Sequence, residues 1–340
     1  MFQFAQRRKL FYLISATIII PGLIAMLYST IQFGSPVRLS IDFTGGTLME
    51  VSFVENFSEQ DVRDALNAYG LEDIIVQRLN PITTDTIEGA HDAAGSRWQI
   101  RTKEIDDISH FRAYLRENLG EFWSPQSVED DPQREAALTT SSVSATVGRE
   151  VTRAALTATL AVAVVILGFI VFAFRRVPHA FRYGACAIIA MFHDILVTMG
   201  IMSMLGIFFG WEADALFLTA VLTVVGYSVQ DTIVVFDRIR ENIPKYRGES
   251  YELIVNRSVL ETIHRSVATQ LNAVFVMIAI VLFGGETIRQ FIAILLIGLV
   301  SGTYSSIFTA VPLLVSWERG ELPLVNREAK RIHHEAPAAR

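Results

Sequence analysis

The sequence predicts an α-helical membrane protein with six spans and one small α+β domain between the first and second span. Six apolar runs are each long enough to cross a bilayer, which takes about 20 residues of helix. Residues 35–150 carry 21 Asp and Glu against 10 Lys and Arg, a net charge of −11, whereas the chain as a whole is −6. The remaining +5 is distributed among the ends of the apolar runs. These observations exclude a single soluble domain and a nucleic-acid binder, whose basic residues would form one continuous footprint.

The first run is too long for a secretory signal, and no small-residue cleavage site follows it, so we predict an uncleaved anchor. Five further runs follow the acidic block. The predicted spans are Leu10–Phe33, Ala154–Phe174, Phe181–Leu205, Leu216–Phe236, Val267–Gly284 and Phe291–Trp317.

Lys and Arg cluster at one set of helix ends, and cytoplasmic loops are the ones rich in these residues. The clusters precede the first span, separate the second from the third, and fill the loop 237–266 and the tail 318–340. Both termini are therefore expected in the cytoplasm and the acidic block outside it. The predicted domains are 1–34 (N-terminus and first span), 35–150 (exported domain), 151–317 (bundle with the cytoplasmic loop 237–266) and 318–340 (cytoplasmic tail).

The exported domain alternates strands and helices. The first strand is followed by a helix that Ser58 caps, because a serine hydroxyl can accept a bond from the first helical turn. The order strand–helix–strand, strand–helix–strand predicts a ferredoxin-like α+β fold. The expected elements are Thr47–Val54, a helix after Ser58, Ile74–Leu79, Arg97–Thr102, Ile105–Leu119 and Ala137–Val147, with loops at Asn80–Gly95 and Ser124–Gln133.

This domain carries no recognisable catalytic set. His91 and His110 stand apart from any nucleophile, and the acidic residues lack the spacing of a calcium loop. Cys186 is the only cysteine, which excludes an intrachain disulfide framework and a Cys-rich metal site. We expect no enzyme activity, metal or cofactor, and interpret the domain as a binding or transmitting module.

Three charged residues occur in or beside the spans, where a charge costs roughly 2.5–3.5 kcal/mol on insertion scales. Asp194 is close to the middle of the third span, Asp231 is in the cytoplasmic half of the fourth, and Arg265 opens the fifth. Arg265 is explained equally well as a basic residue at a helix end, and Asp194 as a carboxylate hydrogen-bonded for packing. For Asp231 the functional interpretation is favoured, since Thr223 and Tyr227 share its helix face. A carboxylate between an apolar environment and a guanidinium can load and release a proton, and Asp231 and Arg265 are placed where they can meet.

Glycines mark three further places. Gly45 and Gly46 permit a tight turn where the chain enters the exported domain, and Gly148 is expected to act as a hinge where it returns. In the last span Gly298, Gly302, Ser306 and Ala310 recur every four residues, which predicts close helix packing.

Several motifs resemble those of the SecF branch of the bacterial SecD/SecF family of protein translocase subunits. The most specific are Ile41-Asp42-Phe43-Thr44-Gly45-Gly46-Thr47 and Gly226-Tyr227-Ser228 followed by Asp231-Thr232. Val147-Gly148-Arg149-Glu150, His193-Asp194, Ile263-His264-Arg265-Ser266 and Phe283-Gly284-Gly285 are similar to the same family.

The resemblance implies a fold related to resistance-nodulation-division transporters, located in the bacterial inner membrane with residues 35–150 in the periplasm. It implies the partners SecD, SecYEG and SecA, with unfolded preprotein as a further partner, and a proton gradient as the energy source. By position, Asp231 would handle protons, Arg265 would be its basic partner, and Asp194 would be a further relay residue. Gln270 and Asn272 depart from the Thr/Ser-rich run usual after this arginine, which puts a hydroxyl-based water wire there in doubt.

Two other functions remain open from the sequence. One is a stand-alone proton-driven exporter of small molecules, although six spans are half the usual number for such a protein. The other is a scaffold subunit that conducts nothing.

Overall fold

The computed structural model describes residues 5–71, 74–79, 96–103, 105, 107–122, 138–143, 145–175 and 179–321. It divides into two compact units, one formed by residues 1–38 with 155–340 and the other by residues 39–154. The expected loops 80–95 and 124–133, together with His91 and nearly all of the tail, lie outside the described residues.

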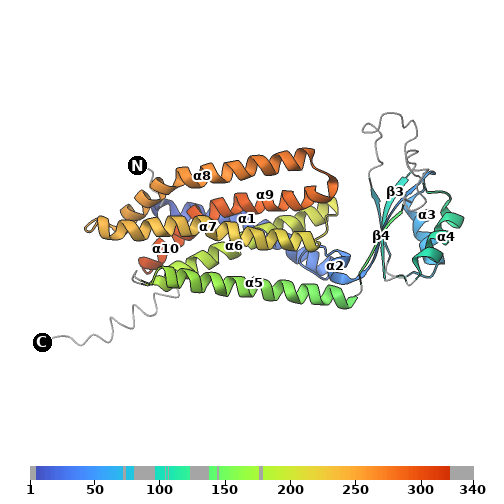
Figure 1. Ribbon diagram of the computed structural model, residues 1–340, viewed down its shortest axis with the longest axis horizontal. Helices are drawn as coiled ribbons and strands as arrows, with labels where there is room; N and C mark the ends of the chain where they lie inside the picture. The colour runs from blue at the N-terminus through green and yellow to red at the C-terminus, as the bar shows by residue number, and fades with distance from the viewer. Residues whose placement is uncertain are drawn as a thin grey trace. The chain divides into compact units, whose positions relative to one another are not determined.

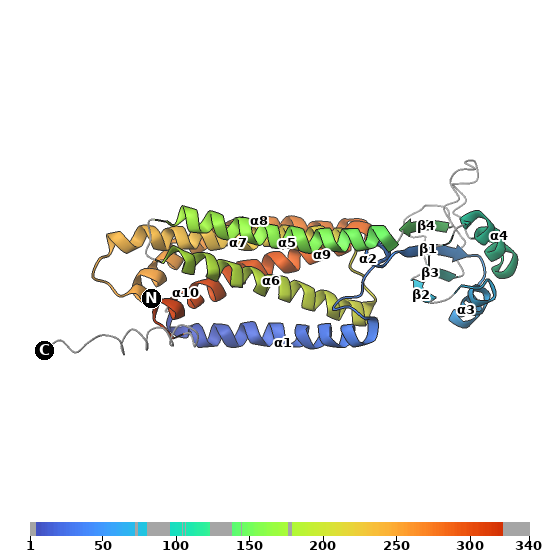
Figure 2. The same ribbon diagram turned by 90° about the horizontal axis from the view of Figure 1, so that it is seen from below.

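The first unit is a bundle of long apolar helices. Within the described residues, six helices are long and apolar enough to cross a membrane, as the hydropathy pattern predicts. Figures 1 and 2 show them running alongside one another, with α1 next to α6. They are α1 (Arg8–Phe33, after the short helix η1, Ala5–Arg7), α5 (Ala145–Ala173), α6 (Ala180–Phe209), α7 (Ala215–Lys245), α8 (Tyr251–Phe283), and α9 (Glu286–Ser305) continued by a π-helical turn η4 (Ser306–Ala310) and by α10 (Val311–Glu318).

The segment 237–266, expected as a loop, is mostly helical, because α7 continues to Lys245 and α8 begins at Tyr251. The two extensions pack through Asn242, whose amide donates to Ser258 Oγ at 3.0 Å and to Glu261 Oε2 at 2.9 Å. Charged residues end an apolar run without ending the helix that carries it. The hydropathy pattern therefore predicts where the apolar part of α7 ends and where that of α8 begins, but not where the two helices end and begin.

Helices approach closely where glycines face each other. A Cβ built on Gly200 of α6 would lie 2.7 Å from Gly22 Cα of α1, so only two glycines permit this crossing. On α9, a Cβ at Gly302 would lie 3.2 Å from Ser228 Cα of α7. The small-residue stripe of the last span therefore does pack closely, as predicted, and its partner is α7.

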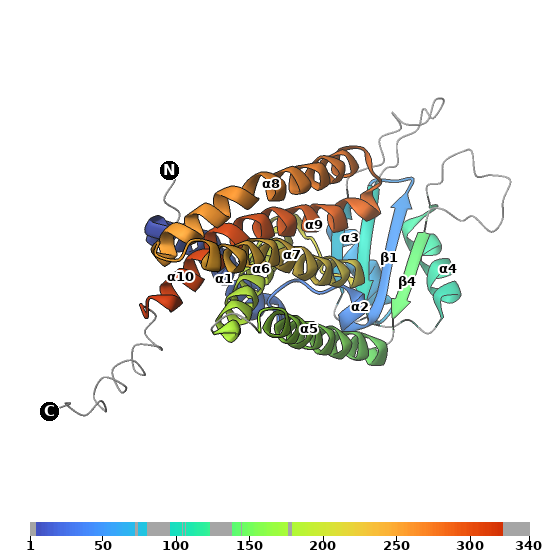
Figure 3. The ribbon, with the colours of Figure 1, turned by 60° about the vertical axis from the view of Figure 1, so that its left-hand side comes forward.

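The second unit is the ferredoxin-like domain that the sequence predicts. Its antiparallel sheet has the order β2-β3-β1-β4, and Figure 3 shows its strands beside α3 and α4. The elements are β1 (Gly46–Phe53), α3 (Glu59–Ala68), β2 (Ile75–Leu79), β3 (Ser96–Thr102), α4 (Ile108–Leu119) and β4 (Leu138–Val143).

Alternation along the strands places one apolar face of the sheet against the two helices. Met49, Val51, Trp98 and Ile100 are fully or almost fully buried there together with residues of α3 and α4 such as Phe111. Ser58 caps α3 in a reciprocal capping box, since its hydroxyl accepts from the Asp61 amide while the Asp61 carboxylate accepts from the Ser58 amide. This confirms the helix start that the sequence predicts.

The entry to this unit contains an element that the strand pattern does not predict. Helix α2 (Ile41–Thr44) begins at Ser40, whose hydroxyl accepts from the Asp42 amide at 3.1 Å. Gly45 and Gly46 then turn the chain into β1 with φ of 73° and 115°, in the region that favours glycine. The expectation of a turn at this pair is confirmed.

Gly148 lies inside α5, not at a break between elements. A Cβ there would lie 2.5 Å from the carbonyl oxygen of Phe43 and 3.2 Å from the Gly45 amide nitrogen. This glycine allows α5 to approach the backbone of α2 at this point, and the hinge expected at Gly148 stays a prediction. The final strand, expected to continue to Val147, ends at Val143, because helix α5 begins at Ala145.

Candidate functional site

Asp231 is buried in the α7–α8 interface of the bundle. Its Oδ2 accepts a hydrogen bond from Gln270 Nε2 of α8 at 2.7 Å, and 4% of the residue is exposed. Gln270 belongs to a buried polar face of α8 that also holds Ser258, Thr262 and Ser266, each four residues from the next. Residues at this spacing lie above one another on a helix. They form a polar line on α8 that begins at Ser258, which contacts Asn242 of α7, and ends at Gln270, which contacts Asp231 of α7.

The structure does not bring Arg265 to this carboxylate in the way the sequence suggested. Arg265 is exposed on α8, and Gln270 contacts Asp231 in its place. The reason is helical geometry: Arg265 precedes Ser266 by one residue and is turned from the buried face by about 100°. The polar residues Thr223 and Tyr227 of α7, expected to continue the site, are only partly buried.

Asp194 is the most completely buried of the three charged residues, with none of its surface exposed. Its Oδ2 accepts from Ser228 Oγ of α7 and Ser305 Oγ of α9, each at 2.5 Å. Its Oδ1 accepts from Ser301 Oγ of α9 at 2.6 Å and lies 3.1 Å from His193 Nδ1. One carboxylate thereby joins three helices.

The two carboxylates differ in how their burial is compensated. Burying a charge is costly unless hydrogen bonds replace the lost water, and charge-assisted bonds are short and strong. Among the described residues, Asp194 accepts from three hydroxyl groups in addition to its histidine contact, whereas Asp231 accepts from the Gln270 amide and has Ser266 beside it. Asp194 is thus built as a fixed junction of α6, α7 and α9, and Asp231 as the less constrained group.

Sequence reasoning missed the three serines. Ser228 is three residues before Asp231 in the Gly226-Tyr227-Ser228 motif and was available as a signal. Ser301 and Ser305 come more than 100 residues after Asp194. The only signal in the sequence was their spacing of four, which places both hydroxyls on one helix face, where they can bind the same group. Gly226 itself is exposed on α7, where a Cβ would contact nothing within 4 Å.

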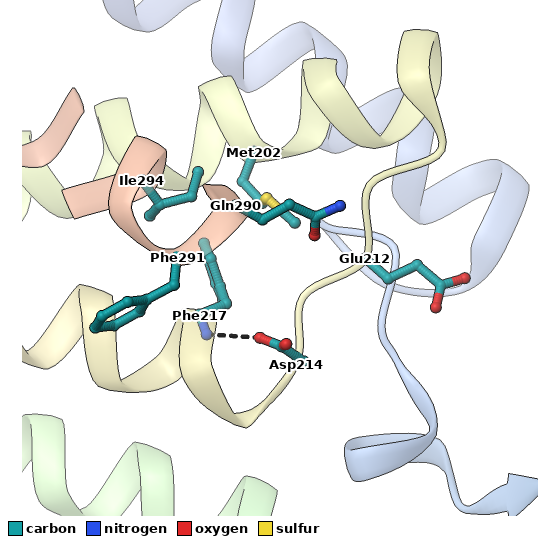
Figure 4. Close-up of a pocket in the computed structure, with 7 residues that line it drawn as sticks. All are labelled: Met202, Glu212, Asp214, Phe217, Gln290, Phe291 and Ile294. Atoms are coloured by element: carbon teal, nitrogen blue, oxygen red, sulfur yellow. Dashed lines mark hydrogen bonds between the residues drawn. The ribbon is translucent and has the colours of Figure 1, made fainter. Parts of the chain in front are cut away.

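The opposite end of the bundle holds a small pocket with an acidic rim, between the loop that precedes α7 and the start of α9. Figure 4 shows Asp214 accepting from the Phe217 amide, at 2.7 Å, with Met202 and Ile294 nearby. Glu212 pairs with Arg38 at 3.2 Å. Gln290, Phe217 and Phe291 also line this pocket.

Among the described residues, no group of three or more His, Cys, Asp or Glu side chains is placed to hold a metal ion. What the arrangement offers chemically is two buried carboxylates and one buried imidazole, all of which can bind protons.

Comparison with known proteins identifies the family. The C-terminal model of the SecD/SecF protein export membrane proteins matches residues 126–320, and the SecD/SecF GG motif matches residues 31–56. A protein translocase subunit SecF from Thermobaculum terrenum is 46% identical over 323 residues, which cover 95% of this chain and 96% of that protein. The SecF subunit of Anaerolinea thermophila is 43% identical over 93% of this chain and 94% of its own length. The chain belongs to the SecF family of protein translocase subunits.

The family's GG motif includes α2 and the Gly45-Gly46 turn described above. Among solved structures, SecDF from Thermus thermophilus, described as a translocon-associated membrane protein, matches with a TM-score of 0.71 and 26% identity. The match covers 94% of this chain but 39% of the SecDF chain. A super-membrane-facing form of SecDF matches in fold, with a TM-score of 0.57. The chain is thus a multi-pass membrane protein with the fold of the smaller part of SecDF.

Proposed function

We propose that this chain is an accessory subunit of Sec-dependent protein export that couples proton flow through its bundle to movement of the exported domain. Asp231 is the proton-carrying group of this proposal. The observation that carries it is a buried carboxylate at the end of a polar line along α8, with the Gln270 amide donating to it and Ser266 beside it among the described residues. Both neighbours belong to one helix, so this carboxylate can change its protonation state without breaking the three-helix network of Asp194.

The partner in this proposal is SecD. Members of the family are named as translocase subunits, and the SecDF chain that matches this fold is more than twice as long as the matched part. SecD would correspond to the part of the SecDF chain that this chain does not match, and would supply the second half of the membrane assembly. SecYEG would supply the channel, and SecA its motor. Affinity purification from solubilised membranes tests this, because recovery without a SecD-like protein or a channel would favour the stand-alone exporter.

The proton role is tested by replacing Asp231 with Asn, which removes titration at nearly constant shape. Inverted membrane vesicles that contain the variant and its partners are supplied with a preprotein, and its export is followed with and without a proton gradient. We expect Asp231→Asn to abolish the stimulation by the gradient. Glu241→Gln is the matched control, since it removes an acid from an exposed position of the same helix. Full stimulation in Asp231→Asn would contradict the proton role and leave the scaffold function.

The orientation is part of the proposal: both termini in the cytoplasm and the exported domain in the periplasm. Glu212 and Arg240 lie toward opposite ends of α7, whose 31 residues span about 46 Å. Single cysteines at these positions should react with an impermeant thiol reagent from opposite sides of the membrane. The native Cys186 is buried and gives little background. Labelling of both positions from the same side would overturn the orientation.

Arg265 has a smaller part in this proposal than the resemblance implies. Its exposure on α8 favours the alternative that it is a basic residue near the membrane surface. Asp194, with its three hydroxyl donors, is proposed as the junction that fixes α7 and α9 to α6 and not as a free carrier.

A further inference from the structure

His193 is a buried imidazole that the proposed proton path along α8 does not use. It lies on α6, 6% exposed, with Nδ1 3.1 Å from Asp194 Oδ1. Its other ring nitrogen, Nε2, is buried and has no hydrogen-bond partner among the described residues. A buried polar atom without a partner is uncommon and calls for an explanation.

The contacts of Asp194 determine which nitrogen of His193 carries the proton. An ionised carboxylate only accepts hydrogen bonds, and this one already accepts from Ser228, Ser301 and Ser305. With Asp194 ionised, His193 Nδ1 donates to it, and the neutral ring is the Nδ1–H tautomer. Nε2 then carries a free lone pair, held in one orientation by the carboxylate.

Polar side chains lead from His193 toward the end of the bundle where α1 begins. The Tyr304 ring stacks on the imidazole with centroids 6.1 Å apart. The Tyr304 hydroxyl donates to the Phe11 carbonyl oxygen at 3.0 Å and accepts from Ser15 Oγ at 3.4 Å. Ser15 also lies 3.2 Å from Thr309 Oγ1. One helical turn before Ser15, the Tyr12 hydroxyl lies 3.0 Å from Ser316 Oγ. We call these five residues (Tyr12, Ser15, Tyr304, Thr309 and Ser316) the α1 seam.

The charged end of this seam is closed by ion pairs. Arg8, one turn before Tyr12, pairs with Glu321 at 2.5 Å and with Glu252 at 3.3 Å. α6 itself carries Arg182, Tyr183, Cys186 and Asp194. The other titratable groups on the helices packed against α6 are Lys9, Tyr12 and Tyr28 of α1, Tyr227, Asp231, Asp237, Arg238, Arg240, Glu241 and Lys245 of α7, Glu286, Arg289 and Tyr304 of α9, and Glu318 of α10. Of these groups, Asp194 forms the hydrogen bond with the imidazole, so it has the largest electrostatic effect on His193.

We propose that His193 is a second proton-binding group of the bundle, positioned by Asp194 and reached through the α1 seam. The step is a transfer of one proton from water to the Nε2 lone pair. The N–H bond forms there, the ring becomes an imidazolium, and the Asp194 carboxylate offsets its charge, as a carboxylate does for other imidazoles that it orients. The proton leaves by the reverse step. The role of His193 in export rests on the proposed function. The geometry of the His193–Asp194 pair does not depend on it.

Nitrogen NMR of the ring tests the pair directly and without export. In the full-length protein, the six other histidines are replaced by Gln so that His193 is the only one. We expect the ¹⁵N shifts to report the Nδ1–H tautomer at high pH and a doubly protonated ring on acidification between pH 8 and 5, the range in which histidine commonly changes charge. Asp194→Asn should remove the preference for the Nδ1–H tautomer. An Nε2–H tautomer, or a ring that stays neutral down to pH 5, would overturn the proposal.

The part in export is measured separately. His193→Asn keeps an amide that can donate to Asp194 but has no titratable nitrogen, and Tyr304→Phe keeps the stacked ring but removes the seam hydroxyl. We expect both to lower gradient-stimulated export at least tenfold in correctly assembled complexes, with His264→Asn, an exposed histidine on α8, as the unchanged control.

The outcomes distinguish the two proposals. Ring protonation as expected, together with wild-type vesicles that show no stimulation by a proton gradient, would sink the proposed function and keep the proton-binding pair. Gradient-stimulated export that is unaffected by both variants would show His193 to be a packing residue and leave the role of Asp231 intact.

Discussion

The contact of α9 with α7 at Gly298 makes a prediction whose size follows from the structure. A Cβ at Gly298 would lie 2.0 Å from Val224 Cγ2 and 2.8 Å from Val224 Cγ1. Ordinary van der Waals contact begins near 3.4 Å, so the closer pair would overlap by about 1.4 Å. Gly298→Ala must move α9 or force the valine into a poor rotamer, and overpacking of this kind typically costs about 1–3 kcal/mol.

The same geometry predicts a rescue. Val224→Ala removes both methyl groups that the new Cβ would meet, and alone it leaves a void that costs about 1–2 kcal/mol. The double variant should be more stable than the sum of the two losses by at least about 1 kcal/mol, because residues in contact are coupled. Gly168→Ala on α5 is the matched control, since a Cβ there meets nothing within 4 Å.

The measurement is the free energy of unfolding of the full chain in detergent micelles, followed by tryptophan fluorescence as denaturant is added. Gly298→Ala as stable as the wild type would refute the close packing of α9 on α7. A loss that Val224→Ala does not relieve would show that some other contact is responsible.

The remaining predictions concern the ferredoxin-like domain. Gly46→Ala should destabilise it by about 1–3 kcal/mol, because φ is 115° and the new Cβ would lie 2.5 Å from the Thr102 carbonyl oxygen; faster amide hydrogen exchange in β1 and β3 would report this, and unchanged exchange would refute it. The hydrogen bonds from Ser58 hold the pKa of Asp61 below its ordinary value of 3.8, so the ionised form is favoured in the folded domain. Its contribution to stability is present above that value and is lost as the pH falls through the lower folded pKa. Asp61→Asn should therefore weaken the acid dependence of hydrogen exchange in α3, while Asp64→Asn, on the same helix, should leave it in place; equal slopes in both variants would contradict the capping role.

Apolar run length predicts the six spans, and alternation with a serine cap predicts the domain fold, because both are local properties of the chain. The ends of α7 and α8 were missed for a physical reason. Charges such as Arg238 and Glu261 mark where an environment becomes polar, while the helix continues because Asn242 and Ser258 pack the two extensions together.

The sequence predicts which buried carboxylates belong to the candidate site, but it does not predict the side chains that contact them. Asp194 and Asp231 were identifiable because a carboxylate in an apolar run has a cost that something must offset. What offsets it comes from other helices, Ser301 and Ser305 in one case and Gln270 in the other, and no sequence spacing links residues on different helices. The same limit explains Arg265: its position along the chain suggested that it meets Asp231, but its helix face was not considered, and its side chain is exposed on α8.

The way the ferredoxin-like domain is tethered has a mechanical consequence. The chain enters at Gly46 and leaves after Val143, and these two residues are paired at one end of the β1–β4 ladder. A pull that separated the two connections would open that ladder from its end, one hydrogen bond after another, which is the weak direction for an antiparallel pair. The packing of Gly148 on the Phe43 backbone clamps that end. A force that separated the two connections would therefore act on the contact between Gly148 and Phe43 as well as on the end of the ladder.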